Sequence, residues 1–286
     1  MMWPLTQMMK TRTRTSGREA SRRARRPQLE SLENRTVLSV TFSAFSSVTP
    51  GTWAYNSATS SWREISTAIP KAMDEGSDGT LFASYSSGTY CYDYSSNRWT
   101  ELTTATASAL SAASDNTFFG SFSSGTYEYH GSWYKLTTDV ATKLAAVSNN
   151  DVYVYFSSGS DRGTWQYDSG WHSITIDAPS AMAASPGGAL FFSYGGGTWE
   201  YNKGWYELTS AEATQLAAVS NSELYATYSS GTYEYHGSWY KLTSAVASQL
   251  GNDGSTMIGS FSSGTYTYDG NGHWSDLTTL PAKLVG

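Results

Sequence analysis

The sequence predicts an all-β fold, a seven-bladed β-propeller of four-stranded blades, from two phrases that recur at a fixed spacing. The first phrase, Gly-Thr-Trp/Tyr-x-Tyr, begins at seven glycines, 33 to 38 residues apart: Gly51, Gly88, Gly125, Gly163, Gly197, Gly231 and Gly264. The second, Trp-x-x-Leu/Ile-Ser/Thr, follows each copy of the first. A period of this length in strand-forming residues is typical of propeller blades, because one small sheet buries its two faces only against neighbouring sheets.

Each repeat contains four short runs rich in Val, Tyr, Phe, Trp and Thr, bounded by Gly, Asn, Asp and Ser, which predicts four antiparallel strands. The first strand carries one Leu or Met. The second carries two aromatic residues three positions apart, as in Tyr153 and Phe156. The third contains the Gly-Thr phrase, and the fourth begins at the repeated Trp. The Leu or Met positions of the first strand are Met73, Leu110, Leu144, Met182, Leu216, Leu250 and Leu284.

The two ends of the repeat array complement each other. After Val40 the chain begins with a second-type strand, so the first repeat lacks its first strand. That strand appears at the other end, where Pro281 to Val285 follows the last Trp. We therefore expect the C-terminal strand to complete the first blade by pairing near Phe42 to Ser46, which closes the ring and removes its open edges.

The repeated Trp residues favour a packing role. One Trp occupies the same position in every repeat, and large aromatic side chains bury extensive area between sheets. We expect Trp133, Trp205 and Trp239 to be largely buried between blades. The alternative is a ring of platforms on which sugars stack, and the two roles are compatible.

The segment 1–38 differs in composition from the repeats at 39–286. It contains nine Lys and Arg residues and three acids, a charge of +6, whereas the remainder carries −12. This predicts a disordered basic targeting segment followed by the propeller domain. By itself, the basic run Arg22 to Arg26 would suggest an arm that binds nucleic acid. We expect no nucleic-acid partner, because the acidic remainder of the chain would repel phosphate.

The string RRPQLESLENRTVLS at residues 25–39 resembles the LEPR-XLL motif of planctomycete proteins, many of them exported. The match consists of Leu32, Glu33, Arg35 and Leu38, and it departs from the motif at Asn34 and Val37. The resemblance implies an extracellular or cell-envelope location. No classical signal peptide supports it, and no apolar run is long enough to span a membrane.

The repeats contain no catalytic or metal-binding constellation that the sequence reveals. His130 and His236 occupy one position of an identical thirteen-residue string, GTYEYHGSWYKLT, and are interpreted as turn residues. Asp74 and Glu75 are likewise interpreted as turn formers. The single cysteine, Cys91, excludes an intrachain disulfide. We therefore expect no enzyme activity, no cofactor and no metal.

The layout of the repeat is similar to that of tectonin-like and tachylectin-like propeller lectins. This resemblance implies a non-catalytic, secreted, carbohydrate-binding protein, with a protein-interaction scaffold as the alternative and a hydrolase or lyase as a weaker one. The expected partner is a glycan or a protein, and the expected state is a monomer. Near-identity of two repeats indicates repeated pockets or recent duplication. The candidate ligand-binding residues lie next to the repeated Trp: Tyr134, Lys135, Tyr206, Glu207, Tyr240 and Lys241.

Overall fold

The computed structural model describes residues 40–45, 51–56, 59, 61–76, 79–94, 96–113, 117–252 and 256–285. Every described strand belongs to the unit Leu38–Gly286. The predicted basic targeting segment and the match to the LEPR-XLL motif lie outside the described residues. No helix in the described part of the chain is long and apolar enough to cross a membrane.

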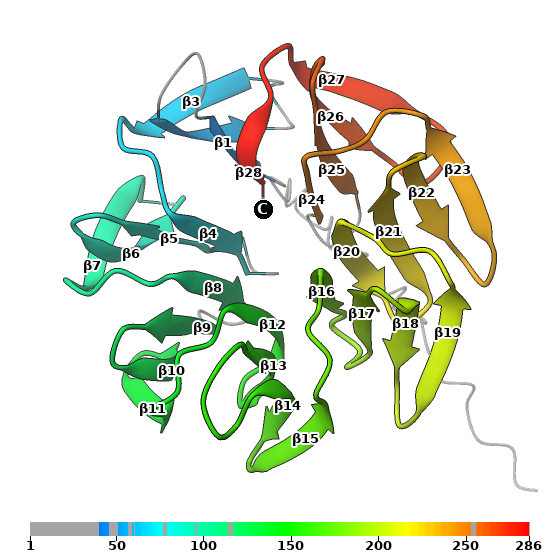
Figure 1. Ribbon diagram of the computed structural model, residues 1–286. Coiled ribbons are helices and arrows are strands. Elements are labelled where there is room, and N and C mark those ends of the chain that lie inside the picture. The colour runs from blue at the N-terminus through cyan, green and yellow to red at the C-terminus, as the bar shows by residue number, and fades with distance from the viewer. Residues whose placement is uncertain are drawn as a thin grey trace, which may run out of the picture. The chain divides into compact units, whose positions relative to one another are not determined.

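The described strands form seven four-stranded antiparallel sheets, arranged side by side around a centre (Figure 1). The all-β propeller with four-stranded blades is therefore confirmed. Each sheet is one blade, and we name blades by their strands. In every sheet the strands follow one another in chain order from the centre outward, except that β28 precedes β1.

The innermost strand of each blade supplies the residues nearest the centre. These strands are β28 (Ala282–Val285), β4 (Ala72–Glu75), β8 (Ala109–Ala112), β12 (Lys143–Ser148), β16 (Ala181–Ala184), β20 (Gln215–Ser220) and β24 (Gln249–Asn252). Each one contacts the innermost strand of the next blade, and β28 contacts β4, so the contacts run around a closed ring. All seven predicted Leu or Met positions lie on these strands. Asp74 and Glu75 lie on β4, so their interpretation as turn residues was wrong.

The second strands carry most of the buried apolar side chains. They are β1 (Val40–Phe45), β5 (Leu81–Tyr85), β9 (Thr117–Phe122), β13 (Asp151–Phe156), β17 (Leu190–Tyr194), β21 (Glu223–Tyr228) and β25 (Met257–Phe261). Phe82, Phe118, Phe191 and Leu224 are completely or almost completely buried. Because the second strands have blades on both faces, those from β5 to β25 carry buried apolar side chains on both faces and show no regular alternation between apolar and polar residues.

The third and outermost strands complete each blade. The third strands are β2 (Gly51–Asn56), β6 (Gly88–Asp93), β10 (Gly125–His130), β14 (Gly163–Asp168), β18 (Gly197–Tyr201), β22 (Gly231–Tyr235) and β26 (Gly264–Tyr268). The outermost strands are β3 (Ser61–Ser66), β7 (Arg98–Thr103), β11 (Trp133–Thr137), β15 (Trp171–Thr175), β19 (Trp205–Thr209), β23 (Trp239–Thr243) and β27 (Trp274–Thr278).

The repeated Gly-Thr phrase has a structural cause. Gly125 has a φ of +131°, a conformation that side chains rarely adopt, and a Cβ atom there would collide with the carbonyl oxygen of Thr137. The next residue, Thr126, is fully buried, and its hydroxyl donates to the carbonyl of Asp139 at 2.8 Å. The phrase therefore fastens the third strand to the turn that leaves the outermost strand.

Ring closure occurs where the sequence predicts it. Strand β28 pairs antiparallel with β1, with Ser43 opposite Val285 and Phe45 opposite Ala282. This joins segments from opposite ends of the propeller unit in one sheet, β28-β1-β2-β3.

Candidate functional site

The repeated Trp connects neighbouring blades. The indole N–H groups of four of these residues within the described ranges donate to a backbone carbonyl of the preceding blade. The pairs are Trp62 with Leu277 at 2.8 Å, Trp99 with Ile65 at 2.7 Å, Trp133 with Leu102 at 3.2 Å and Trp239 with Leu208 at 3.0 Å. Trp133 and Trp239 are half-buried, whereas Trp205 is 37% exposed. The expectation that all three are largely buried was therefore wrong for Trp205.

An aromatic notch accompanies the Trp at the blade boundary. Beside Trp133, the rings of Phe122 and Tyr127 meet the indole edge to face, with centroids 5.4 and 6.2 Å away. Ser124 shares a hydrogen bond with the Tyr127 hydroxyl at 3.0 Å. These side chains, with Thr103 and Ala105 of the preceding blade, line a cavity of about 200 Å³. The notch therefore combines apolar ring surface with hydroxyl groups at a junction between two blades.

The same arrangement recurs in other blades, because it is built from the repeated positions. In the β20–β23 blade, the ring centroid of Tyr228 lies 5.5 Å from that of Tyr233 and 5.4 Å from that of Trp239. The hydroxyl of Ser230 shares a hydrogen bond with the hydroxyl of Tyr233 at 2.9 Å. Corresponding sets occur in two further blades: Tyr85, Tyr90, Trp99 and Ser87; and Phe261, Tyr266, Trp274 and Ser263.

Blades that depart from the pattern modify the notch. In the β12–β15 blade the third-strand aromatic is Trp165, whose indole N–H donates to the carbonyl of Asp161 in an extended loop at 2.8 Å. In the β16–β19 blade, Tyr194 and Trp199 stack with an interplanar angle of 25° instead of meeting edge to face. The notch is therefore a repeated feature with blade-specific variation.

The six candidate residues from the sequence lie on three outermost strands, β11, β19 and β23, and do not converge on one site. Lys135 and Lys241 belong to notches: their ammonium groups lie 5.6 and 5.7 Å from the ring centres of Tyr127 and Tyr233. The hydrogen bond with Ser124, and then the nearby Lys135 charge, lower the pKa of Tyr127. Glu207 lies opposite Trp199 in the strand register.

The tyrosines of that set lie on the other face of the blade. Successive residues of a strand point to opposite faces, so Tyr134 does not share the notch with Trp133 and Lys135. Its ring stacks on His130 at 5.1 Å, with an interplanar angle of 18°. Tyr134, Tyr206 and Tyr240 are 49%, 59% and 57% exposed. These tyrosines form three separate exposed positions on the outer edge.

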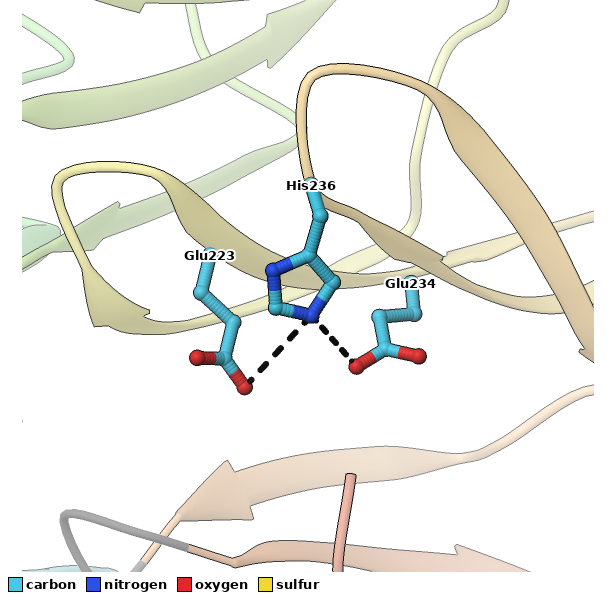
Figure 2. Close-up of side chains that lie close together, drawn as sticks. All are labelled: Glu223, Glu234 and His236. Carbon is cyan, nitrogen blue, oxygen red and sulfur yellow. Dashed lines mark hydrogen bonds and ion pairs between the residues drawn. The ribbon is translucent and has the colours of Figure 1, made fainter. Parts of the chain in front are cut away.

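A second cluster, which sequence reasoning missed, lies in the β20–β23 blade (Figure 2). One oxygen of Glu223, one of Glu234 and one ring nitrogen of His236 lie within 4.8 Å of one another. His236 Nε2 is 2.7 Å from Glu234 Oε1 and 3.9 Å from Glu223 Oε1. His236 does lie in the turn between β22 and β23, as interpreted from the sequence, but that interpretation did not include these partners.

Strand register explains this cluster. Tyr225 pairs with Glu234, so Glu223 and His236 lie two residues further along the same face of the same hairpin. The signal in the sequence was Glu223 itself, because the equivalent residue of the otherwise near-identical repeat is Thr117, which lies opposite His130.

Comparisons with known proteins support the fold. No family model matches the chain, and no curated protein gives a significant match. Among solved structures, the WD40 repeats of RRP9 are similar with a TM-score of 0.60 and 11% identity, covering 85% of this chain and 89% of that one. U3-55K has a TM-score of 0.58 at 12% identity, covering 85% and 90%. The structure of YCF48 bound to D1 peptide has a TM-score of 0.52 at 12% identity, covering 78% of this chain and 90% of that one. At these identities the likeness establishes the β-propeller fold alone.

Proposed function

We propose that the chain is a non-catalytic binding protein whose aromatic notches take carbohydrate. The observation that carries this proposal is the notch beside Trp133, where three aromatic rings and the hydroxyls of Ser124 and Tyr127 line one cavity of about 200 Å³. Sugar rings present apolar C–H surface on one side and hydroxyls around the edge. A small pocket with ring surface and a few hydrogen-bonding groups suits such a ligand.

Repetition strengthens the argument. Each notch is shallow and half-exposed, so a single site would bind weakly. Several equivalent notches on one rigid ring would bind a surface with many glycans much more tightly, because after the first contact the remaining contacts are intramolecular. The lysines over Tyr127 and Tyr233 add a positive charge, which favours neutral or anionic sugars over cationic ligands.

An extracellular or envelope location belongs to the same proposal. It rests on the basic segment and the resemblance of residues 25–39 to the LEPR-XLL motif. Fractionation of the native cells, followed by detection of the chain in envelope or culture medium, tests it. Detection only in the cytoplasmic fraction contradicts this location.

The test of the ligand class is a glycan array probed with the full chain and two variants. The notch variant combines Tyr90→Phe, Tyr127→Phe, Tyr233→Phe and Tyr266→Phe, which removes four hydroxyls and keeps the rings that pack between blades. The outer-edge variant combines Tyr134→Ser, Tyr206→Ser and Tyr240→Ser, which leaves the notches intact. We expect the notch variant to lose most glycan binding and the outer-edge variant to keep it.

A protein partner is the second candidate, favoured by the exposed rings of Tyr134, Tyr206 and Tyr240. One of the structural neighbours, YCF48, was solved with a bound peptide. If the unaltered chain binds no glycan, and one protein is recovered by the parent and by the notch variant but not by the outer-edge variant, this second function replaces the first.

A further inference from the structure

The Glu223–Glu234–His236 cluster brings two carboxylates and one imidazole together on one hairpin. Glu234 is 5% exposed, and it lies close to Glu223 on one face of the hairpin. No Lys or Arg in the part of the chain that the structure describes forms a salt bridge with either carboxylate. Buried carboxylates ordinarily have a cationic partner or a metal ion, because an unpaired charge in the interior is costly.

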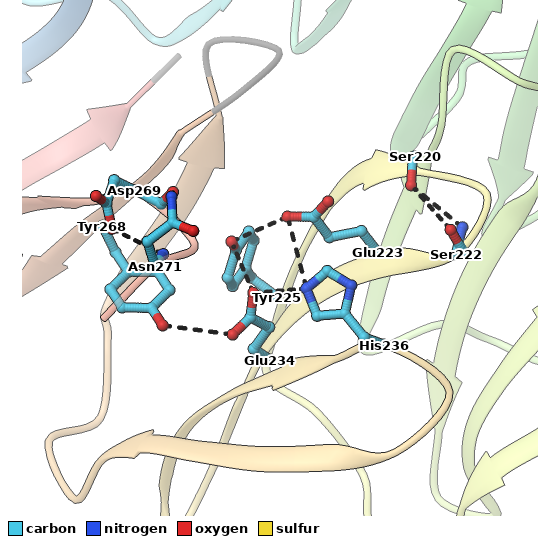
Figure 3. A network of polar contacts seen from close by, with 9 residues as sticks. All are labelled: Ser220, Ser222, Glu223, Tyr225, Glu234, His236, Tyr268, Asp269 and Asn271. Atoms are coloured by element: carbon cyan, nitrogen blue, oxygen red, sulfur yellow. Dashed lines mark hydrogen bonds and ion pairs between the residues drawn. The ribbon is translucent and has the colours of Figure 1, made fainter. Parts of the chain in front are cut away.

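Two tyrosine hydroxyls, those of Tyr225 and Tyr268, lie against the carboxylate oxygens of the cluster, and each has one proton to donate (Figure 3). The hydroxyl of Tyr225 lies 3.1 Å from Glu223 Oε1 and 3.2 Å from Glu234 Oε1. It has one proton, so it donates to one carboxylate at a time. Tyr268, from the next blade, reaches the other oxygen of Glu234 at 3.5 Å.

We infer that Glu223, Glu234 and His236 form a binding site for a divalent transition-metal cation such as Zn²⁺. A tetrahedral Zn²⁺ with bonds of about 2.0 to 2.2 Å holds its ligand atoms roughly 3.3 to 3.6 Å apart. The distances of 2.7 and 3.9 Å from His236 Nε2 to the two carboxylates lie on either side of that value. All three ligand atoms lie within 4.8 Å of one another, so side-chain rotations can bring them to ligand distance.

The ligand types select the metal. An imidazole nitrogen with two carboxylate oxygens suits Zn²⁺ and similar ions better than Mg²⁺ or Ca²⁺, which prefer oxygen ligands only. The Tyr225 hydroxyl lies within hydrogen-bond distance of both carboxylates and can orient the one to which it donates, as residues around metal ligands commonly do. The side chains of His236 and Glu223 are 44% and 22% exposed, so the ion has access from solvent and a fourth ligand position faces outward.

The β8–β11 blade provides an internal control. It contains the same Glu-Tyr-His sequence at Glu128 and His130, but Thr117 and Phe119 stand where the metal site has Glu223 and Tyr225. Glu128 instead accepts the backbone N–H of Asn150 at 3.0 Å. Two histidines in identical local sequence therefore have different neighbours: His236 has Glu223 and Tyr225 on the adjacent strand, whereas His130 has Thr117 and Phe119 there and stacks on Tyr134.

The experiment is a calorimetric titration of the untagged, chelator-treated full chain with ZnCl₂ at about pH 8. We expect one site that His236→Ala and Glu223→Gln each weaken at least tenfold and that His130→Ala leaves unchanged. Tyr225→Phe should weaken binding about tenfold, the usual effect of removing a group that orients ligands. Mg²⁺ titrated in place of Zn²⁺ should bind more weakly at the same site.

A thermal melt supplies an independent readout. Because the ion binds only the folded chain, Zn²⁺ should raise the Tm of the parent and of His130→Ala, and should not raise that of His236→Ala. Folding of His236→Ala is expected, since this side chain is half-exposed. Absence of Zn²⁺ binding by the parent, or equal binding by His236→Ala and the parent, would overturn the inference. Either result leaves the carbohydrate proposal untouched, because that site lies in different residues.

Discussion

The β8–β11 and β20–β23 blades contain the same thirteen residues, at 125–137 and 231–243, and these residues adopt the same register. Both copies place a Trp against the preceding blade and a Lys over a Tyr ring. The second strands differ: TFFGSF in one blade and ELYATY in the other. The identical sequence therefore places the same Trp and Lys in the notch of both blades. The second strand, which differs, determines which side chains lie beside the shared Glu and His.

The equivalent glutamates of the two blades, Glu128 and Glu234, have different hydrogen-bond partners. Glu128 and Glu234 are equally inaccessible, at 2% and 5% exposure, but one accepts a backbone N–H and the other lies among Tyr225, Tyr268 and His236. The hydrogen-bond partners of a side chain buried between blades thus depend on the residues of the adjacent strand and of the next blade. Near-identity between repeats does not by itself indicate equivalent sites.

The largest expected effect concerns the continuity of the chain within a blade. The four strands of the β8–β11 blade follow one another along the chain, and so do those of the β20–β23 blade. The β28-β1-β2-β3 sheet lacks this continuity. Removal of residues 280–286 deletes β28, which leaves one backbone edge of β1 unpaired and exposes the faces of the two blades that β28 contacts. We expect a large fall in Tm, measured by circular dichroism against a control that lacks only Gly286. A truncated chain that melts with the parent would contradict closure by this strand.

The next effect asks whether the two identical strings are energetically equivalent. Trp133→Ala and Trp239→Ala each remove an indole that packs on the notch rings and bonds to the preceding blade. We expect each to lower the free energy of unfolding by about 3 kcal/mol, measured by urea denaturation. Trp205→Ala should cost less, since that indole is more exposed. Losses for Trp133 and Trp239 that differ by more than about 1 kcal/mol would show that the neighbouring strands determine the packing as well.

A smaller effect depends on a difference between the inner strands that precede the two blades. Asp74 Oδ2 accepts the N–H of Ala112 in β8 at 2.8 Å, whereas the equivalent residue before β20 is Ala183. Burial outweighs the backbone hydrogen bonds from Ala112 and Glu75 and raises the pKa of Asp74 to about 6. The folded state therefore holds this proton more tightly than the unfolded chain does.

It follows that the stability contributed by Asp74 is complete below about pH 4 and is lost as the pH rises through 6. Between these limits, Asp74→Asn should gain up to roughly 3 kcal/mol relative to the parent, because asparagine does not ionise. Urea denaturation at a series of pH values measures the difference, with the exposed Asp276→Asn as the control. A constant difference between Asp74→Asn and the parent over this range would count against the raised pKa.

The smallest effect concerns the lysines of the two notches. Lys135→Met and Lys241→Met keep most of the stem and remove the charge that lies over Tyr127 or Tyr233. We expect each to cost at most about 1 kcal/mol, equally in both blades, since exposed cation–π contacts are weak. Denaturation in low and high salt would sharpen the comparison, because added salt should reduce both losses together.

The repeat made much of the fold predictable. The position of every Leu or Met of the inner strands followed from alignment of the repeats, and the pairing of residues 281–285 with the first strand followed from the missing strand of the first repeat. Trp205 departed from the expectation in a blade where Tyr194 and Trp199 stack on each other, and where the rings in contact with Trp205 are Phe192 and Tyr201. That arrangement depends on side-chain packing within one blade, which the repeated position does not encode.

The candidate site was less predictable. Tyr134 and Lys135 were grouped because they are adjacent, yet strand alternation separates them, and this rule was available from the sequence. The cluster of Glu223, Glu234 and His236 required the register of β21 with β22. Hairpin register depends on turn geometry and on which face is buried, so spacing along the chain alone did not reveal it.

The pairing of β1 with β28 has a consequence for synthesis of the protein. Ser43 and Val285 are partners in one sheet but lie 242 positions apart (285 minus 43). At about 5 to 20 residues per second, a ribosome takes roughly 10 to 50 s to produce the second partner after the first. During that interval β1 has an open backbone edge while later blades are already emerging. A nascent chain of this architecture therefore depends on whatever shields that edge, and slower translation lengthens the time in which two unfinished chains can pair with each other.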